Sequence, residues 1–325
     1  MSSSFFVFEI KVNRENFITI LCSQSADIFF LWLSSFSLHL TRFTVNGCSL
    51  KKHFLCTRRK RICKMSTFRL ATVNAHSFRN PSTGNNTCEE LASIFKPFKL
   101  DLIAVQEIIE NNSWKRFCEL VDLPYYQVGL PAGSYLGNGF ACRYPIREYS
   151  NQRTTDKCKN ETRGFLQCVF DATEDSFLHN RTFAVTHLDH LDEKNRLRQI
   201  KEFDPLEKKI DVLLGDMNSL SENDYSDEYF EENIRQLRQK SNWEPPFFDL
   251  TNFITKQLNY RDAFRLKNPD LKDEKVVTCR FHTRIDYIYL KPNENDSWSL
   301  EDCFIINTSN VTDHNAVFAS FQKKD

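Results

Sequence analysis

Several kinds of protein are excluded by what this sequence lacks. The 11 cysteines of the 325-residue chain form no CxxC pair, and no histidine stands at zinc-finger spacing. A small zinc-binding module is therefore not expected. An odd number of scattered cysteines in a long chain is typical of reduced thiols in an intracellular protein. No internal repeats or low-complexity tracts occur, so a repeat architecture is not indicated either.

The chain also lacks a net charge, with 43 Lys or Arg against 43 Asp or Glu. The balance is uneven, because residues 1–66 hold ten basic and three acidic residues. Residues 67–325 are correspondingly acidic. The main body thus gives no bulk signal for non-specific nucleic-acid binding, although a local basic groove remains open.

A long hydrophobic run is missing as well. The apolar stretch from Asp27 to Leu40 has 13 residues after the aspartate, whereas a membrane-spanning helix needs about 20. We expect no stable membrane anchor. A secretory signal fits poorly, and a mitochondrial targeting segment, which is basic and Ser-rich, matches better. The cluster "TRRKRICK" (Thr57–Lys64) is either a nuclear address or a solvated linker.

Residues 1–66 are predicted to be an N-terminal extension that precedes a domain at 67–325. Met65 stands directly before the first regular strand, so we favour an upstream extension that is absent from the working protein over a targeting role. The predicted location is intracellular, in the cytoplasm or nucleus, or in the mitochondrion if the extension is real. We expect a monomer.

From residue 67 onward the patterns become regular and mixed. Strands are predicted at Phe68–Ala75, Leu100–Ile108, Arg181–Asp189, Arg284–Leu290 and Thr312–Phe321, with a strand pair at 138–144 and 164–171. Helices are predicted at Thr87–Phe98, opened by a capping box, and at Glu193–Phe203 and Ser226–Lys240. Adjacent strands without an intervening helix exclude a strictly alternating barrel. The fold class is α/β, with two mixed sheets packed face to face and helices outside.

The stretch "VLLGDMNSL" (Val212–Leu220) ends an aliphatic strand with an acid and an amide two residues apart. Alternate residues of a strand point to the same side, so Asp216 and Asn218 face one point if the strand continues. A β-turn is the alternative, because Gly, Asp and Asn are all turn formers.

Polar residues recur wherever an apolar strand stops. They are Asn74, Glu107, His187, Asp216, Asn218, Asp286, Asp313 and His314. Each has a structural explanation when taken singly, for example a turn residue, a pairing of Asp286 with Arg284, or a loop. Together at one edge, so many carboxylates need a cation. Oxygen-rich sites suit Mg²⁺ or Mn²⁺ rather than zinc.

The ordered set "TVN", "QE", "THLD", "GDMN", "RIDYIY" and "TDHNAV" resembles the endonuclease/exonuclease/phosphatase superfamily over about residues 67–325. The resemblance implies a four-layer α/β sandwich and metal-assisted hydrolysis of a phosphoester. It implies metal ligation by Glu107, with Asn74 beside it and Asp313 near. Asp216 would orient the attacking water, and Asn218 would hold a phosphate oxygen.

The resemblance further implies that His314 contacts the scissile phosphate while Asp286 orients it, and that His187 is another phosphate contact. Arg163 is either an additional phosphate contact or a surface residue at a strand edge.

The branch of the superfamily is left open by departures from its patterns. "TVNAHSF" lacks the Trp and Gly usual in the abasic-site and tyrosyl-DNA branches, and "SLSEND" replaces an expected Arg-Asp pair. A nuclease or DNA-end phosphodiesterase, with nucleic acid as its substrate, is the favoured function. The alternative is a phosphatase or phosphodiesterase for a small or lipid-linked phosphate. A catalytically inactive scaffold is disfavoured because no core residue of the site is missing.

Overall fold

The computed structural model describes residues 66–155 and 162–324 in full, and four short strands nearer the N-terminus by their backbone alone. The chain divides into two compact units, Met1–Cys63 and Lys64–Asp325. The first contains an antiparallel sheet in the order β1-β2-β3-β4, formed by Phe8–Val12, Phe17–Cys22, Ile28–Ser34 and Ser37–His39. The interpretations of residues 1–66 as an extension or a targeting segment stay predictions. None of the described helices is both long and apolar enough to span a bilayer.

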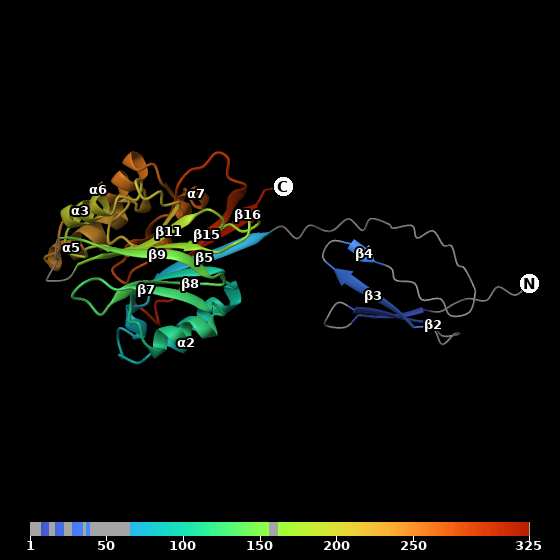
Figure 1. Cartoon of the computed structure of the whole chain (residues 1–325). Helices are drawn as coiled ribbons and strands as arrows, with labels where there is room; N and C mark the ends of the chain where they lie inside the picture. The colour runs from blue at the N-terminus through green and yellow to red at the C-terminus, as the bar shows by residue number, and fades with distance from the viewer. Residues whose placement is uncertain are drawn as a thin grey trace, which may run out of the picture. The chain divides into compact units, whose positions relative to one another are not determined.

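The second unit is built on two six-stranded sheets (Figure 1). One has the order β15-β16-β5-β6-β8-β7, with bounds Trp298–Ile306, Ala316–Lys323, Thr67–Asn74, Leu102–Ile108, Gly137–Cys142 and Tyr125–Gly129. The other has the order β13-β14-β12-β11-β10-β9, with bounds Arg261–Asp262, Asp286–Leu290, Val212–Asp216, Thr182–His187, Gly164–Phe170 and Ile146–Arg153. Each sheet contains one parallel pair, β5 with β6 and β11 with β12, so both are mixed as predicted.

Helices cover the outer faces of both sheets (Figure 1). The helices of this unit are α1 (Cys88–Phe95), α2 (Asn112–Leu120), α3 (Glu193–Phe203), α4 (Asp227–Tyr229), α5 (Gln236–Lys240), α6 (Asp249–Asn252) and α7 (Ala263–Lys267), and those that pack on the outer faces are α1, α2, α3 and α6. Short 3₁₀ segments lie at His76–Phe78, Lys96–Phe98, Glu222–Asp224 and Asp273–Val276, and π-helical turns at Phe230–Arg235 and Phe253–Gln257.

Three apolar clusters give this unit four layers. The first fills the space between the sheets, where Leu70 and Ala104 of one sheet meet Val185 and Leu214 of the other. The second joins the outer face of the β5–β6 sheet to α1 and α2. The third joins the outer face of the β11–β12 sheet to α3 and α6. Burial of these alternating faces drives the α/β/β/α arrangement, and the predicted sandwich is confirmed.

The predicted pairing of the strands at 138–144 and 164–171 is wrong. These segments form β8 and β10, which lie in different sheets. The two strands contact each other across the core, where the rings of Phe140 and Phe170 meet edge to face with centroids 6.1 Å apart. The partner of β10 is β9, whose mostly exposed polar residues hide its strand pattern. Strands β7 and β15 and helices α2 and α6 were likewise not foreseen.

The capping box at Thr87 is also wrong. The side chain of Thr87 is buried and makes no capping hydrogen bond. Instead, the Asn86 side-chain oxygen accepts from the Cys88 backbone N–H at 3.0 Å. Pro97, which cannot continue an α-helix, lies in the 3₁₀ segment that follows α1. The helices predicted at 193–203 and 226–240 are confirmed, the second with a π-helical middle and with Ser226 as its cap.

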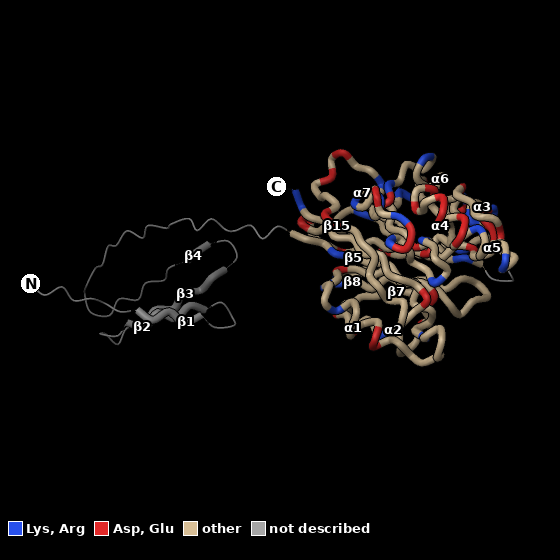
Figure 2. The backbone as a smooth tube through the Cα atoms, turned by 180° about the vertical axis from the view of Figure 1, so that it is seen from behind, with Lys and Arg blue, Asp and Glu red and all other residues tan. Residues whose placement is uncertain are grey.

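Acidic and basic residues are interspersed along the backbone of the second unit (Figure 2). The acidic excess of residues 67–325 is therefore distributed rather than gathered into one block. Electrostatic recognition at this unit has to come from the few groups around a site rather than from a uniformly charged face.

Candidate active site

The strand topology brings the predicted residues to one edge of the sandwich. Asn74 and Glu107 lie at or next to the carboxyl ends of the parallel pair β5–β6, and His187 and Asp216 end the parallel pair β11–β12. Strand β14 runs antiparallel to β12, so its first residue, Asp286, lies directly opposite Asp216.

Asp313 and His314 reach this edge from the start of the last strand, β16. That strand runs antiparallel to β5, so the residues before it lie at the edge where β5 ends. All eight predicted site residues thus come from this edge, although they are spread over 241 positions of the chain, from 74 to 314.

Gly215 lets the two strands of the second sheet approach each other at the site. Its φ is +131°, and a Cβ added there would lie 2.0 Å from the carbonyl oxygen of Thr186 on β11. Only glycine tolerates both conditions. The next pair in the β11–β12 register is His187 and Asp216. The glycine therefore sets how closely these two site residues approach each other.

Glu107 is a charged carboxylate despite its burial near the end of β6. Its φ is +55°, and the β6–β8 register shifts between Val105 and Ile108, which turns its side chain to the edge. Burial by itself would raise the pKa of Glu107. The hydrogen bond with His76 is the largest of the effects that together outweigh burial, so the net pKa lies well below its ordinary value.

Asn74 links the two acids at the centre. Its Nδ2 donates to Glu107 Oε1 at 3.0 Å and to Asp216 Oδ2 at 3.1 Å, while its Oδ1 accepts from the His76 backbone N–H at 3.1 Å. In this orientation the amide positions two carboxylates. Ligation of a metal through its oxygen stays a prediction.

Asp216, Asp286 and His314 form a buried group whose potential ligand atoms lie within 4.8 Å of one another. His314 Nδ1 contacts Asp286 Oδ2 at 2.8 Å, and His314 Nε2 lies 3.8 Å from Asp216 Oδ2. The 2.8 Å contact is a short, charge-assisted hydrogen bond. We therefore interpret this group as an acid–imidazole pair facing a second acid, rather than as the metal site.

The ionisation of this group suits proton transfer. Burial opposes a charged imidazole, but the Asp286 carboxylate holds the pKa of His314 well above its ordinary value. Burial, and next the nearby Asp286, raise the pKa of Asp216 to about 7. A histidine that stays protonated beside an acid that ionises near neutral pH provides one donor and one acceptor.

Asn218 and His187 border the same space. The Asn218 backbone N–H donates to Asp216 Oδ1 at 2.9 Å, and its Nδ2 donates to the Leu188 carbonyl at 3.1 Å. His187 Nε2 lies 3.5 Å from Asp216 Oδ2. Burial, and next the charge of Arg163, lower the pKa of His187 to about 3, so this imidazole is neutral. The φ of Asn218 is +51°, so the chain turns here, as the turn interpretation of "GDMN" predicts, while the catalytic roles of Asp216 and Asn218 stay predictions.

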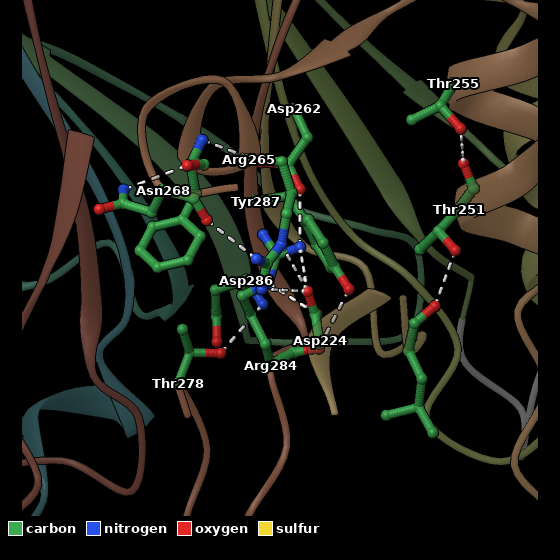
Figure 3. Close-up of polar contacts among 12 residues, drawn as sticks. Asp224, Thr251, Thr255, Asp262, Arg265, Asn268, Thr278, Arg284, Asp286 and Tyr287 are labelled. Atoms are coloured by element: carbon green, nitrogen blue, oxygen red, sulfur yellow. Dashed lines mark hydrogen bonds and ion pairs between the residues drawn. The ribbon is translucent and has the colours of Figure 1, made fainter. Parts of the chain in front are cut away.

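A buried ion-pair network fixes the segment that carries Asp286 (Figure 3). Arg284 donates to Asp224 through Nε at 2.8 Å and Nη2 at 2.9 Å, and to Asp262 at 2.7 Å. The Asp286 backbone N–H donates to Thr278 Oγ1 at 3.2 Å. The structural explanation of Asp286 as a partner of Arg284 is thus wrong, because Arg284 pairs with other acids and leaves Asp286 to His314.

A divalent ion fits the oxygen donors at Glu107 and Asp313. Among the described residues, Asp313 Oδ1 is buried and accepts no hydrogen bond. With the Glu107 carboxylate, which His76 Nδ1 also approaches, this orphaned oxygen offers donors that a hard cation would satisfy.

Comparison with solved structures gives many confident matches. An endonuclease/exonuclease/phosphatase protein from Beutenbergia cavernae matches with a TM-score of 0.59 and 15% identity, over 79% of this chain and 72% of that one. TDP2 from D. rerio, solved with a single-strand DNA product, matches with a TM-score of 0.55 and 11% identity, over 79% and 99%. A mannosyl-6-phosphatase from Bacteroides thetaiotaomicron matches with a TM-score of 0.50 and 15% identity, over 78% and 99%. Neither a family model nor a curated protein matches the sequence significantly.

The fold is that of the endonuclease/exonuclease/phosphatase proteins. The fold and the resemblance predicted from the ordered motifs are therefore confirmed, and the branch stays unassigned. In this endonuclease/exonuclease/phosphatase fold, the motif residues meet at one edge of the sandwich.

Two cavities border the site, and His190 lines both of them. One of about 200 Å³ is lined by Glu107, His187, Arg163 and His190. Arg163 thus lies beside the site, with its Nη2 3.0 Å from His190 Nδ1. Its role as a phosphate contact stays a prediction.

The other flanking cavity, of about 400 Å³, opens beside Asn218 and is lined by Trp243, Phe281 and Ile285. A further cavity of about 380 Å³ lies away from this edge, beside the opposite ends of β11 and β12, where Arg181 pairs with Asp296. It contains none of the predicted residues.

Sequence reasoning missed His76, Thr278, Asp224 and Thr312. Thr312 Oγ1 donates to the Asn74 carbonyl at 2.8 Å and so ties the two ends of the site together. His76 had a usable signal, because it stands two residues after Asn74. Asp224 had none, since its partner is 60 residues away.

Proposed function

We propose that this chain is a divalent-metal-dependent phosphoester hydrolase that acts on nucleic acid, as a nuclease or DNA-end phosphodiesterase. The observation that carries the proposal is the convergence of the His314–Asp286 pair and the Asp216 carboxylate with the acids Glu107 and Asp313. Acid, base and metal-binding groups then surround one space in which a phosphate fits.

Asp216 is the residue that orients the attacking water and accepts its proton. A pKa near 7 matches a base that works at neutral pH. Asn74 and the backbone of Asn218 hold its two oxygens by hydrogen bonds, so the carboxylate has a fixed direction. A fixed base is worth more than a mobile one because the reacting atoms must lie in line.

His314 donates a hydrogen bond to a phosphate oxygen. Asp286 fixes its Nδ1 side, which directs Nε2 toward Asp216 and the space beside it. The protonated imidazole stabilises the charge that develops on the phosphate. The Asn218 amide and His187 would contact other phosphate oxygens.

Glu107 and Asp313 would hold the Mg²⁺ or Mn²⁺ ion, with Asn74 adjoining. The ion would neutralise phosphate charge and act as a Lewis acid. The pKa of Glu107 lies well below its ordinary value, so its carboxylate is negatively charged at neutral pH and can attract the ion.

The aromatic cavity beside Asn218 favours a nucleic-acid substrate. The rings of Trp243 and Phe281 meet edge to face at 4.8 Å, and the Arg280 guanidinium lies 4.8 Å from the Phe281 ring. The Trp243 side chain is 43% exposed, so its surface is available for contact. Aromatic surfaces with an adjacent arginine suit unstacked bases and a phosphate backbone. Among proteins of this fold, TDP2 was solved with a single-strand DNA product.

The smaller cavity supports a second candidate, a phosphatase for a small phosphate. It joins Glu107 and His187 to Arg163 and His190 in a volume of about 200 Å³. That space suits a compact anionic group rather than a polymer. A mannosyl-6-phosphatase shares the fold.

The test is hydrolysis by the full chain with Mg²⁺, Mn²⁺ or EDTA. The substrates are abasic duplex DNA, 5′-phosphotyrosyl DNA, single-stranded DNA and RNA, and inositol and sugar phosphates. EDTA-sensitive cleavage of a nucleic acid alone supports the first proposal, and cleavage of a small phosphate alone supports the second. An inactive, correctly folded protein would contradict both.

Asp216→Asn and His314→Ala should each reduce kcat by at least about 100-fold, because each removes a group that acts in the transition state. Asp270→Asn, at an exposed acid, is the matched control and should keep full activity. Circular dichroism should show that all three variants are folded. Near-normal turnover in either site variant would refute the role assigned to that residue.

A further inference from the structure

His76 lies between the two acids that would hold the metal. Its Nδ1 is 3.6 Å from Glu107 Oε2 and 3.5 Å from Asp313 Oδ1. The imidazole is 39% exposed, so it borders the open side of the site. Asp313 Oδ1 is a buried carboxylate oxygen that accepts no hydrogen bond among the described residues, and His76 Nδ1 faces it.

The backbone around His76 holds its ring in this position. His76, Ser77 and Phe78 have φ values of +44°, +57° and +54°, in the region that non-glycine residues rarely adopt. Such residues are strained and persist where the surroundings determine them. Here the surroundings are the Asn74 side chain, which accepts from the His76 N–H, and the Phe78 ring, which packs 5.2 Å from Phe117.

The two separations from His76 Nδ1 suit ligands of one ion, and the Glu107 and Asp313 carboxylates would have to move toward each other to share it, because the three residues do not form a group whose ligand atoms all lie within 4.8 Å. With bonds of about 2.0 to 2.2 Å, neighbouring ligand atoms lie roughly 3.0 to 3.6 Å apart. The contacts of His76 Nδ1 with the two carboxylates fall at the upper end of this range, where an ion would draw them together. Asp313 uses its other oxygen, Oδ2, toward Arg280 at 3.6 Å, which leaves Oδ1 facing His76 Nδ1.

We propose that His76 supplies a nitrogen ligand to the divalent ion held by Glu107 and Asp313, and that this nitrogen biases the site toward Mn²⁺ over Mg²⁺. Imidazole is a good ligand for transition metals, whereas Mg²⁺ prefers oxygen. The inference rests on the proposed metal-dependent function, because it needs an ion at these acids. It adds a ligand that the eight predicted residues do not include.

The experiment is electron spin-echo spectroscopy of Mn²⁺ bound to the full chain, with competition by Mg²⁺ to measure relative affinity. The wild type should show nitrogen modulation from a directly coordinated imidazole, which ¹⁵N-histidine labelling should convert to the ¹⁵N pattern. His76→Gln should remove the modulation and weaken Mn²⁺ binding by at least about tenfold, with a smaller effect on Mg²⁺.

His282→Gln is the matched control, since His282 is an exposed histidine that also has a positive φ, +62°. It should leave both the modulation and the affinities unchanged. His76→Asn is a second variant in case His76→Gln fails to fold, and the labelled wild type tests nitrogen ligation without any substitution.

The outcomes separate the two proposals. If Mn²⁺ binds without nitrogen modulation, or if the modulation survives in the folded His76 variants, the nitrogen ligand is not His76 and this inference is overturned alone. Survival would instead indicate a ligand such as His314 in its group with Asp216 and Asp286. If Mn²⁺ does not bind to the wild type at all, the metal-dependent function itself is refuted.

Discussion

Replacement of Gly215 by alanine tests whether the approach of β11 and β12 builds the site. The added Cβ would lie 2.0 Å from the Thr186 carbonyl oxygen, a backbone atom that cannot rotate away. Relief requires the two strands to separate by more than 1 Å, since ordinary contact begins near 3.4 Å. The register pair after Thr186 and Gly215 is His187 and Asp216, so separation moves two site residues apart.

The cost has two parts that a control can separate. A φ of +131° is strained for any L residue, at about 1 to 3 kcal/mol. The steric clash in a packed sheet adds about 1 to 3 kcal/mol or more. Gly84 also has a positive φ, +71°, but a Cβ there meets nothing within 4 Å. Gly84→Ala should therefore cost only about 1 to 2 kcal/mol.

Gly215→Ala should lower the free energy of unfolding by about 3 to 5 kcal/mol, measured by urea denaturation monitored by tryptophan fluorescence. The Tm should fall by roughly 10 °C or more, against a few degrees for Gly84→Ala. Hydrolysis should fall in Gly215→Ala even well below its Tm and remain normal in Gly84→Ala. Equal stability losses for the two variants, or a fully active Gly215→Ala enzyme, would refute the reasoning.

Two further predictions concern buried groups. Asp224→Asn leaves Arg284 and Arg265 without their shared carboxylate, so the free energy of unfolding should fall by about 3 to 5 kcal/mol, while Asp270→Asn should change it by less than about 0.5 kcal/mol. Burial raises the pKa of the Cys279 thiol to about 11, so iodoacetamide labelling at pH 8 should be about 100-fold slower in the native protein than in urea. Mass spectrometry of the labelled peptides checks this, and equal rates would contradict the buried position of Cys279.

The sequence predicted which residues meet at one edge of the sandwich, because they sit at strand ends. A strand of four or five apolar residues followed by a polar one is visible locally, as at Asn74 and Asp216. Strand direction then determines the edge, since parallel strands end together and antiparallel ones start there. The order of six motifs supplied the long-range information that composition could not.

What the sequence did not reveal depends on tertiary context. The exposed polar face of β9 resembles a loop, so β8 and β10 were paired in error. The Thr87 side chain is buried, which no local pattern indicates. The partner of Arg284 could not be identified from spacing, because Asp286 stands two residues away and Asp224 stands 60 residues away.

The acids at the site and the acids behind it differ in the cations that balance their charge. Asp224 and Asp262 are matched by the arginines Arg284 and Arg265, whose guanidinium groups are almost fully enclosed by acids and carbonyls. The four carboxylates at the strand edge are Glu107, Asp216, Asp286 and Asp313. Within the described residues, their cationic contacts are imidazoles and one exposed arginine, Arg280.

Imidazoles balance such a cluster only while protonated, and His187 is held neutral by its burial. On the side of Glu107 and Asp313, away from the His314–Asp286 pair, the cationic contacts are the partly exposed His76 and the exposed Arg280 rather than a buried arginine. A divalent cation, bound by the protein or brought by the substrate, would neutralise the charge of these carboxylates. This uneven placement, with arginine behind the site and acids at its mouth, is the physical reason to expect the ion at Glu107 and Asp313 rather than at His314.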